Sequence, residues 1–257
     1  MPTIIHWIEQ LPDEVVRARP RLFQAYVGLL ILSVRYDEAR RLLDGLGAAS
    51  FASAGASAHA TLRGWGDAIR AGLSAGFGDI ATAHALIEQA QTRLAPHDDY
   101  EQATLSVAQS YLMEAQGRPT SAIDFRRAAI RRYQAAGRIQ PALVAMVSVS
   151  EYLHMHGRLH EAWQTAQDVV DQAACLEDAP SAMSGAAFVE QAGVLYEWDR
   201  LDEALDLTLR AVTLAEMVGT RICSRLPTRS SLRCILRGGS LRRWSAYWSA
   251  RAARIFC

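Results

Sequence analysis

The chain contains no lysine. All 27 of its basic residues are arginine, a bias typical of a GC-rich bacterial genome. A phosphate-binding P-loop needs the lysine of G-x-x-x-x-G-K-[ST], and Schiff-base catalysis needs a lysine amine. The absence of lysine therefore excludes a P-loop ATPase and lysine-dependent covalent catalysis within these 257 residues.

Cysteines and long apolar runs are also scarce. The four cysteines (Cys175, Cys223, Cys234 and Cys257) show no C-x-x-C spacing, which argues against a zinc site or a disulfide framework. No apolar run approaches the roughly 18 residues that a membrane span requires. The first residues lack the basic start and apolar stretch of a signal peptide. We therefore expect a cytoplasmic protein that does not enter a membrane.

Residue patterns for catalysis or metal binding are missing as well. No Ser-His-Asp, Cys-His or paired-carboxylate arrangement stands out. His154, His156 and His160 lie near Glu151, but His154 and His156 differ by about 200° around a helix and cannot share one face. We expect polar residues at a solvated turn there. The sequence predicts no enzyme activity, no cofactor and no metal site.

What the chain does contain is a repeat. A six-residue signature that ends in alanine occurs five times, at intervals of 44, 39, 40 and 42 residues. The copies read VRYDEA, GDIATA, GRPTSA, GRLHEA and DRLDEA, and their alanines are Ala39, Ala83, Ala122, Ala162 and Ala204. A period near forty without strand-like stretches indicates stacked helical hairpins, each of which buries its apolar face against a neighbour.

The spacing of apolar residues places the helices. Positions ten before and seven after each alanine are always apolar, and positions three after it are apolar except at Thr165. Offsets of zero, three and seven share one helical face, and the small alanine marks the closest approach of two helices. The sequence predicts paired helices near 20–33 and 36–46, 57–75 and 79–93, 99–116 and 119–136, 140–156 and 159–175, and 181–197 and 200–217.

These elements define the predicted fold. It is an all-α, right-handed α-solenoid (superhelix) of tetratricopeptide-like helical hairpins. Residues 1–19 form a leading helical segment, and residues 20–218 form the repeat region as one extended domain. Asp98 and Asp99 precede a helix and are predicted to cap it. Trp65 and Trp163 are predicted to pack between helices and not to stack on a sugar.

Residues 219–257 are different in character. They contain nine arginines and no acidic residue, whereas the residues before them carry a net charge of −9. This aberrant Arg/Ser/Cys-rich tail fits a shifted reading frame in GC-rich DNA. Two alternatives stay open: a basic arm with interleaved aromatic residues that contacts nucleic acid or an anionic membrane, and a plain disordered tail.

The opening of the chain resembles a known family. The segments W-I-E-Q-L-P at 7–12, R-P-R-L at 19–22 and Y-D-E-A-R-R-L-L at 36–43 resemble the start of the sensor region in MalT-like, large ATP-binding LuxR-type transcriptional regulators. The family implies a nucleotide-binding module, a superhelical sensor region and a DNA-binding helix-turn-helix. Only the sensor region is recognisable here, so the chain is interpreted as a truncated fragment without the ATPase and DNA-binding domains.

The expected function is therefore signal sensing by binding. The expected partner is a small-molecule inducer or a protein on the concave face, without direct nucleic-acid contact from residues 1–218. Four arginines on one predicted helix are candidates for contacting an anionic group: Arg126, Arg127, Arg131 and Arg132. Alternatively, they pair with acids on adjacent helices or face water.

Two further expectations concern assembly. A final hairpin without a neighbour leaves Leu205, Leu209 and Val212 uncovered unless the tail lies across them, which predicts self-association. A free-standing protein–protein scaffold unrelated to transcription is the alternative function. An in-frame P-loop module upstream and a helix-turn-helix in the shifted frame downstream would favour the regulator.

Overall fold

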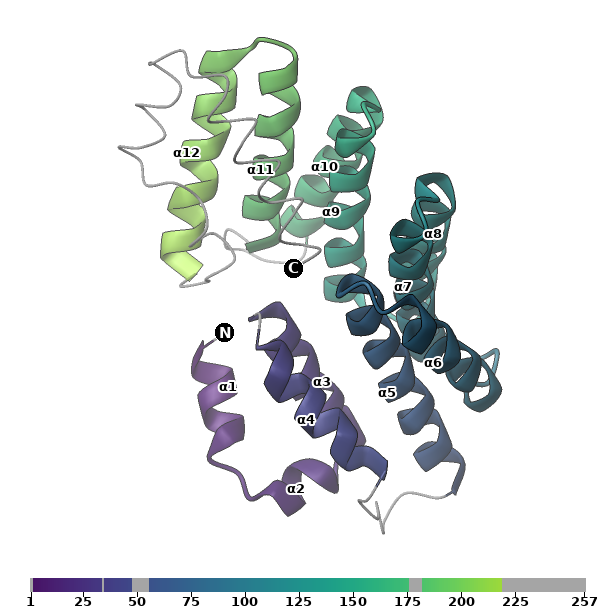
Figure 1. Ribbon diagram of the computed structural model, residues 1–257. Helices are drawn as coiled ribbons and strands as arrows, with labels where there is room; N and C mark the ends of the chain where they lie inside the picture. The colour runs from purple at the N-terminus through teal and green to yellow at the C-terminus, as the bar shows by residue number, and fades with distance from the viewer. Residues whose placement is uncertain (1, 34, 48–55, 176–181, 219–257) are drawn as a thin grey trace. The chain divides into compact units, whose positions relative to one another are not determined.

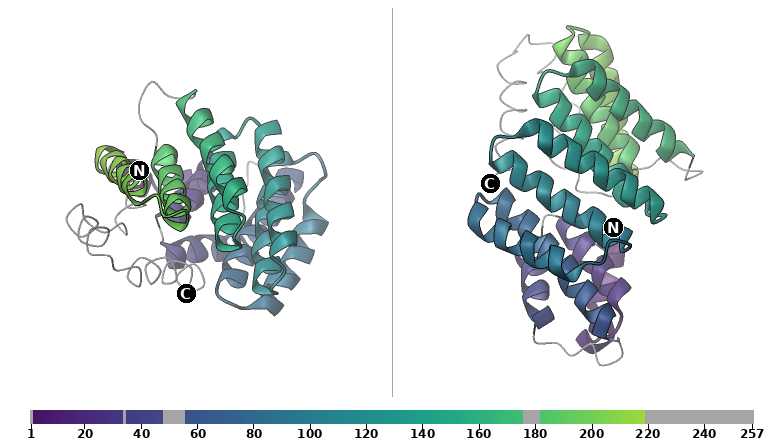
Figure 2. Two further views of the ribbon diagram at one scale, coloured as in Figure 1. Left: turned by 90° about the horizontal axis from the view of Figure 1, so that it is seen from above. Right: turned by 90° about the vertical axis from the view of Figure 1, so that its right-hand side faces the viewer.

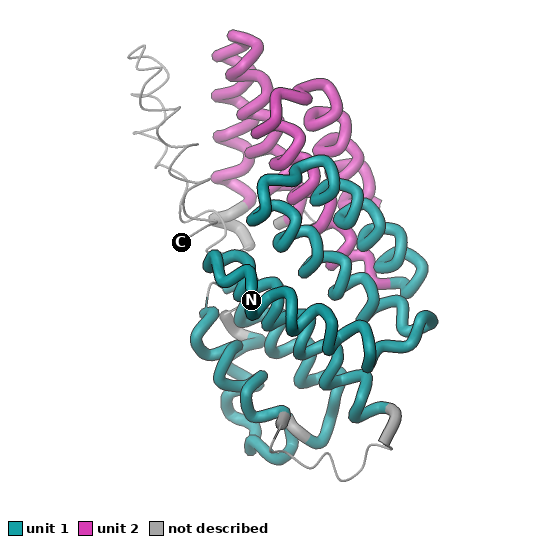
Figure 3. The backbone as a smooth tube through the Cα atoms, turned by 45° about the vertical axis from the view of Figure 1, so that its right-hand side comes forward, with its two compact units in different colours: residues 1–137 teal, residues 138–257 magenta. Residues whose placement is uncertain are grey.

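The computed structural model describes residues 2–33, 35–47, 56–175 and 182–218, and within these ranges it contains twelve α-helices, one 3-10 helix and no strand (Figure 1). The chain forms two compact units, residues 1–137 and 138–257 (Figure 3). In both units, helices that follow one another along the chain pack together. The all-α repeat architecture predicted from the sequence is confirmed.

The first unit contains a leading pair of short helices and three hairpins. The bounds are α1 (Pro2–Glu9), α2 (Asp13–Arg17), α3 (Pro20–Leu32), α4 (Tyr36–Asp44), the 3-10 helix η1 (Gly45–Gly47), α5 (Ala56–Gly76), α6 (Ile80–Arg93), α7 (Asp99–Ala115) and α8 (Pro119–Ala135). Helix α3 pairs with α4, α5 with α6, and α7 with α8, while α5 also packs against α7 (Figure 2). Each hairpin therefore covers part of the next.

The second unit contains two hairpins. They consist of α9 (Ile139–Met155), α10 (Leu159–Ala174), α11 (Ala182–Glu197) and α12 (Leu201–Val218). Helix α11 contacts α9, α10 and α12, so the fifth hairpin packs on both helices of the fourth.

The ten helices of the five hairpins begin and end within two residues of the ranges predicted from the sequence. The predicted tail at residues 219–257 lies outside the part of the chain that the structure describes. The division into two units falls between α8 and α9, inside the predicted repeat region of residues 20–218.

The signature alanines lie in the core, as the pattern predicts. Ala39, Ala83, Ala122, Ala162 and Ala204 are all 0% exposed. The residues seven positions later are also buried: Leu46, Ala90, Ala129, Val169 and Ala211. Burial of five small side chains at equivalent positions shows that each pair of helices makes its contact at the same place in the repeat.

The third predicted core position needs a correction. The residues three after each alanine are only half-buried, whereas those four after it are buried: Leu43, Ile87, Arg126, Ala166 and Thr208. On a helix of 3.6 residues per turn, an offset of four lies about 40° from the alanine and an offset of three about 60° on the other side. The position nearer to the alanine is the one that faces the neighbouring helix.

The turns inside the hairpins use the left-handed backbone conformation. Gly78, Gly117 and Gly157 have φ angles of 83°, 71° and 72°. The amide of Gly117 donates to the Glu114 carbonyl at 2.8 Å, and the next amide, of Arg118, donates to the Met113 carbonyl at 2.8 Å. These bonds satisfy carbonyls at the end of α7. Gly117 and Gly157 thus lie just beyond the end of the first helix of their hairpins.

In the fifth hairpin an aspartate stands where the turns of the second, third and fourth hairpins have glycine. Asp199 has a φ of 58°, a conformation that a side chain with a β-carbon adopts only at a cost. Replacement of Asp199 by glycine is expected to raise the free energy of unfolding by about 0.5–1 kcal/mol, because glycine adopts this conformation freely. Urea denaturation measures the gain, and a decrease in stability would contradict it.

Two helix-interior glycines provide a matched pair of predictions. A β-carbon at Gly64, in α5, would lie 2.8 Å from both Cγ and Cδ2 of Leu94, while one at Gly28, in α3, would meet nothing within 4 Å. Gly28→Ala is expected to stabilise the protein by up to about 1 kcal/mol through helix propensity. Gly64→Ala is expected to destabilise it by about 1–2 kcal/mol through overpacking. Thermal melts of both variants test this, and equal effects would contradict it.

The three residues that were considered as uncovered on the last hairpin differ in exposure. Val212 is 9% exposed, and Leu205 and Leu209 are half-buried. Self-association through these residues stays a prediction.

None of the helices in the described ranges is both long enough and apolar enough to cross a membrane.

Candidate functional site

The four candidate arginines lie on α8 but in different environments. Arg126 is only 2% exposed and takes the core position four residues after Ala122. Its guanidinium carbon lies 4.5 Å from the centre of the Tyr111 ring on α7. This cation–π contact lets an arginine replace the aliphatic residue found at the same position in the first two hairpins. Arg126 therefore contributes to packing between α7 and α8.

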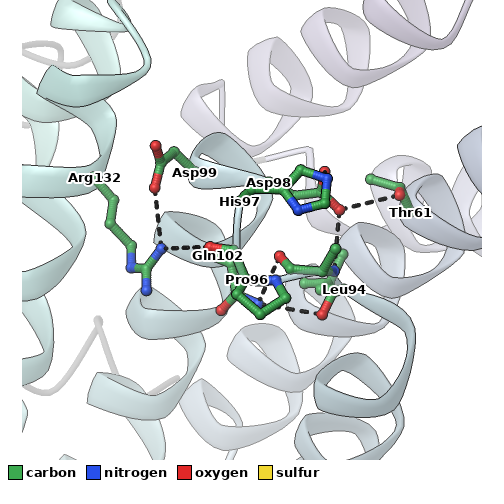
Figure 4. Close-up of polar contacts among 9 residues, drawn as sticks. Thr61, Leu94, Pro96, His97, Asp98, Asp99, Gln102 and Arg132 are labelled. Carbon is green, nitrogen blue, oxygen red and sulfur yellow. Dashed lines mark hydrogen bonds and ion pairs between the residues drawn. The ribbon is translucent and has the colours of Figure 1, made fainter.

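The other three arginines are more accessible. Arg132 donates from Nη1 to Asp99 Oδ1 at 3.1 Å and to the Pro96 carbonyl at 3.4 Å (Figure 4). Arg127 is half-buried and Arg131 is exposed. The four side chains thus do not form one exposed stripe, because Arg126 is enclosed. Whether Arg127 and Arg131 contact an anionic ligand stays a prediction.

The connection between the second and third hairpins is held by polar contacts (Figure 4). Asp98 Oδ2 accepts a hydrogen bond from Thr61 Oγ1 on α5 at 3.2 Å and one from the Ala95 amide at 3.1 Å. Gln102 Nε2, on α7, donates to the carbonyls of Leu94 and Ala95 at 3.4 and 3.2 Å. The loop is therefore fixed to α5 by Thr61 and to α7 by Gln102.

This geometry corrects one sequence prediction. Asp98 stands at the N-cap position of α7, but its side chain makes no capping hydrogen bond. The carboxylate instead turns back to the Ala95 amide, which would otherwise lack a partner in the loop; aspartate often bonds to nearby backbone in this way. Asp99, in the first turn of α7, fits the favourable interaction of an acid with the helix dipole.

Aromatic side chains stack where one hairpin turn meets the preceding hairpin. Phe77 packs edge-to-face on Tyr36, with ring centres 6.1 Å apart, and Arg40 lies 5.5 Å from the centre of the Phe77 ring. In the second unit, Trp198 packs on Trp163 at 5.8 Å. In both places a residue six before the signature alanine contacts the residue that directly follows the alanine of the preceding repeat.

The two tryptophans named in the sequence analysis are largely or partly buried, and one of the histidines contacts an aromatic ring. Trp65 is 1% exposed in the core of the first unit, and Trp163 is half-buried. His160 lies 5.0 Å from Trp198, measured between ring centres. Within the described ranges, no group of three His, Cys, Asp or Glu side chains is placed to hold a metal ion.

Sequence reasoning missed a set of bidentate ion pairs at the starts of the second helices. Arg35, Arg158 and Arg200 bind Glu38, Glu161 and Glu203 respectively, each through Nε and Nη2 to both carboxylate oxygens. These hydrogen bonds lower the pKa values of Glu38 and Glu203. The signal was present, because arginine precedes the signature alanine by four residues and glutamate by one in all three copies.

A buried ion pair on α5 was also missed. Asp67 is 2% exposed and contacts Arg93 Nη1 at the end of α6, and its other oxygen lies 3.4 Å from Arg70 Nη2. No repeat signature marks an aspartate at this place, so the sequence offered no sign of its burial.

The stacked hairpins, the shared turn geometry and the repeated core positions define a tetratricopeptide-like helical-repeat protein. The chain belongs to the MalT-like TPR region family, whose model matches residues 66–228. The match begins inside α5 and ends ten residues after α12. No curated protein matches the chain. The resemblance stated from the sequence is thereby confirmed for the repeat region.

Proposed function

We propose that residues 20–218 serve as the ligand- or protein-binding module of a LuxR-type transcriptional regulator, which recognises a small-molecule inducer or a protein partner on the concave face of its superhelix. The observation that supports this is the match to the MalT-like TPR region over residues 66–228. In a complete relative, binding there would shift an equilibrium between a resting and an oligomerising form, of which this chain would retain only the binding part. Since these 257 residues contain no lysine, a P-loop module would have to come from a different segment.

The DNA on either side of the coding region tests the regulator. We expect an upstream reading frame that encodes a P-loop module and a downstream frame that encodes a helix-turn-helix. Intact, unrelated genes on both sides would contradict the proposal and favour the free-standing scaffold.

A thermal-shift assay tests the binding role in solution. The full chain is melted with and without a low-molecular-mass extract of cells from the source organism. A ligand at a hundred times its Kd adds about 2.7 kcal/mol to the free energy of unfolding, which raises the melting temperature by several degrees. Arg131→Glu on α8 is expected to reduce the shift, whereas Arg41→Glu, at an arginine that is also exposed but lies on α4, is not. Equal loss in both variants would contradict recognition by α8, and the absence of any shift with the extract would contradict a small-molecule inducer.

A further inference from the structure

The first turn of α8 lacks an ion pair that three other hairpins make. In those hairpins the arginine four residues before the signature alanine binds the glutamate one residue before it. The third hairpin keeps the arginine, Arg118, but has Ser121 in place of the glutamate. Arg118 is exposed, and it pairs with no carboxylate among the described residues. The third hairpin therefore holds one half of the ion pair.

The backbone around Arg118 matches the backbone at a complete pair. In the third hairpin the Arg118 amide donates to the Met113 carbonyl at 2.8 Å, and the amide of the signature alanine donates to the Arg118 carbonyl at 3.1 Å. In the fourth hairpin the Arg158 amide donates to the Leu153 carbonyl at 2.8 Å, and the signature alanine donates to the Arg158 carbonyl at 3.0 Å. A side chain with the reach and charge of glutamate at the corresponding place would therefore meet Arg118 as Glu161 meets Arg158.

Phosphorylation gives a serine that reach and that charge. The terminal oxygens of phosphoserine are separated from Cα by the same number of bonds as the carboxylate oxygens of glutamate. A phosphate group carries a charge of about −1.5 to −2 at neutral pH, and a guanidinium binds phosphate through two nitrogens as it binds a carboxylate. A phosphate on Ser121 would thus complete the pair that three other hairpins make with glutamate.

We propose that Ser121 is a phosphorylation site and that Arg118 holds the phosphate. A protein kinase supplies the phosphoryl group from a nucleoside triphosphate. Oγ of Ser121 forms a bond to the γ-phosphorus, the bond from this phosphorus to the bridging oxygen of the β-phosphate breaks, and the nucleoside diphosphate leaves. The hydroxyl proton passes to a base of the kinase. This site is independent of the binding function proposed above.

The first turn of α8 is accessible to such an enzyme. Ser121 is half-buried, and Arg118 and Thr120 beside it are exposed. The ends of helices fray, so they open at a lower free energy than helix interiors. A serine in the first turn can therefore enter the active site of a kinase without unfolding of the hairpin.

The second hairpin provides a matched control. Thr82 takes the position directly before the signature alanine there, but Asp79 stands at the position that corresponds to Arg118. Asp79 Oδ1 accepts a hydrogen bond from the Thr82 amide at 3.1 Å. A negative charge introduced at Thr82 would therefore be repelled by Asp79, whereas one introduced at Ser121 is attracted by Arg118.

Glutamate substitutions in the full chain test the geometry. Ser121→Glu is expected to raise the melting temperature by about 1–2 °C, since it completes an exposed ion pair. Ser121→Gln has the same reach without the charge and is expected to gain less than half as much. Thr82→Glu is expected to give no gain. A rise in Ser121→Glu that is absent when Arg118→Gln is added shows that the arginine is the partner.

Phosphoserine placed at position 121 during translation tests the pair itself. The melting temperature is expected to rise by about 2–4 °C, and Arg118→Gln is expected to remove at least half of the rise. The ³¹P resonance should change with pH around a midpoint about 0.5 lower in the protein with Arg118 than in the Arg118→Gln variant, because the arginine favours the dianion. A purely structural effect of Arg118→Gln on the fold would leave this midpoint unchanged.

Mass spectrometry of the full chain isolated from cells of the source organism tests whether the modification occurs. Proline follows Arg118, so trypsin leaves that bond intact and produces the peptide 94–126. Fragment ions of this peptide distinguish a phosphate on Ser121 from one on Thr120. We expect phosphate on Ser121, retained when Thr120→Ala is introduced.

Two results would overturn the proposal. The first is recovery of the peptide 94–126 without phosphate, or with phosphate on Thr120 alone, from both growing and stationary cells. The second is an equal effect of phosphoserine at position 121 on the melting temperature and the ³¹P midpoint with and without Arg118→Gln.

Discussion

Replacement of Asp67 by asparagine is expected to lower the free energy of unfolding by about 3 kcal/mol, because removal of one member of a buried ion pair leaves its partner charge without compensation. The carboxylate of Asp67 is 3% exposed and faces two arginines, Arg93 and Arg70. The arginine side chains are each 28% exposed, so water partly relieves them, and the effect should fall at the lower end of the range for buried pairs. Urea denaturation measures the loss.

A matched control and a double variant sharpen this test. Asp44 lies 4.0 Å from Arg70 but is 61% exposed, so Asp44→Asn is expected to cost less than about 1 kcal/mol. Asp67→Leu combined with Arg93→Met removes both charges and is expected to recover part of the loss seen with Asp67→Leu alone. Asp67→Asn with wild-type stability would show that this ion pair does not stabilise the fold.

Substitution of Ala83 by leucine is expected to destabilise the protein by about 3 kcal/mol, since extra methylene groups in a well-packed core force side chains and backbone to move. Ala83 is 0% exposed and belongs to the same hydrophobic core cluster as Ala71 and Ala108. The same substitution at Ala85, two residues along α6 and exposed, is expected to change stability by less than about 0.5 kcal/mol.

The measurement is the urea midpoint of each variant, with far-UV circular dichroism to establish that α6 remains helical. Similar midpoints for Ala83→Leu and Ala85→Leu would mean that the signature alanines do not mark the closest approach of the helices. In that case the small residue at this place in all five repeats would need a different explanation.

How far the sequence predicted the fold depended on which residues filled the repeated positions. The alanines and the residues seven after them showed the pattern clearly, because all ten are apolar. The position four after the alanine is buried in all five hairpins, but Arg126 and Thr208 concealed it. An arginine in a sequence is normally read as a surface residue, and the contact with the Tyr111 ring that accompanies its burial is not visible in the sequence.

The candidate site was predicted only in part, because residue type and spacing do not show what packs against a side chain. Arg126 was assigned to a binding stripe on the basis of charge and spacing alone, and these do not report the stacking ring contributed by α7. Residues of the opening motifs, among them Ile8, Glu9 and Leu42, line a small cleft formed by α1 to α4, but the motifs do not predict that these residues meet. Its components are ordinary leucines, aromatic residues and acids that only the packing of the helices brings together.

The stacking of aromatic residues at the hairpin turns has a consequence for engineering. The partners of Phe77 and Trp198 lie in the preceding hairpin, at Arg40 and Trp163. A hairpin transplanted by itself into a different array would bring half of such a contact and expose a large aromatic ring to water. Chimeras built from this protein should therefore exchange consecutive hairpins as pairs. Each junction should precede a hairpin whose residue six positions before the signature alanine is not aromatic.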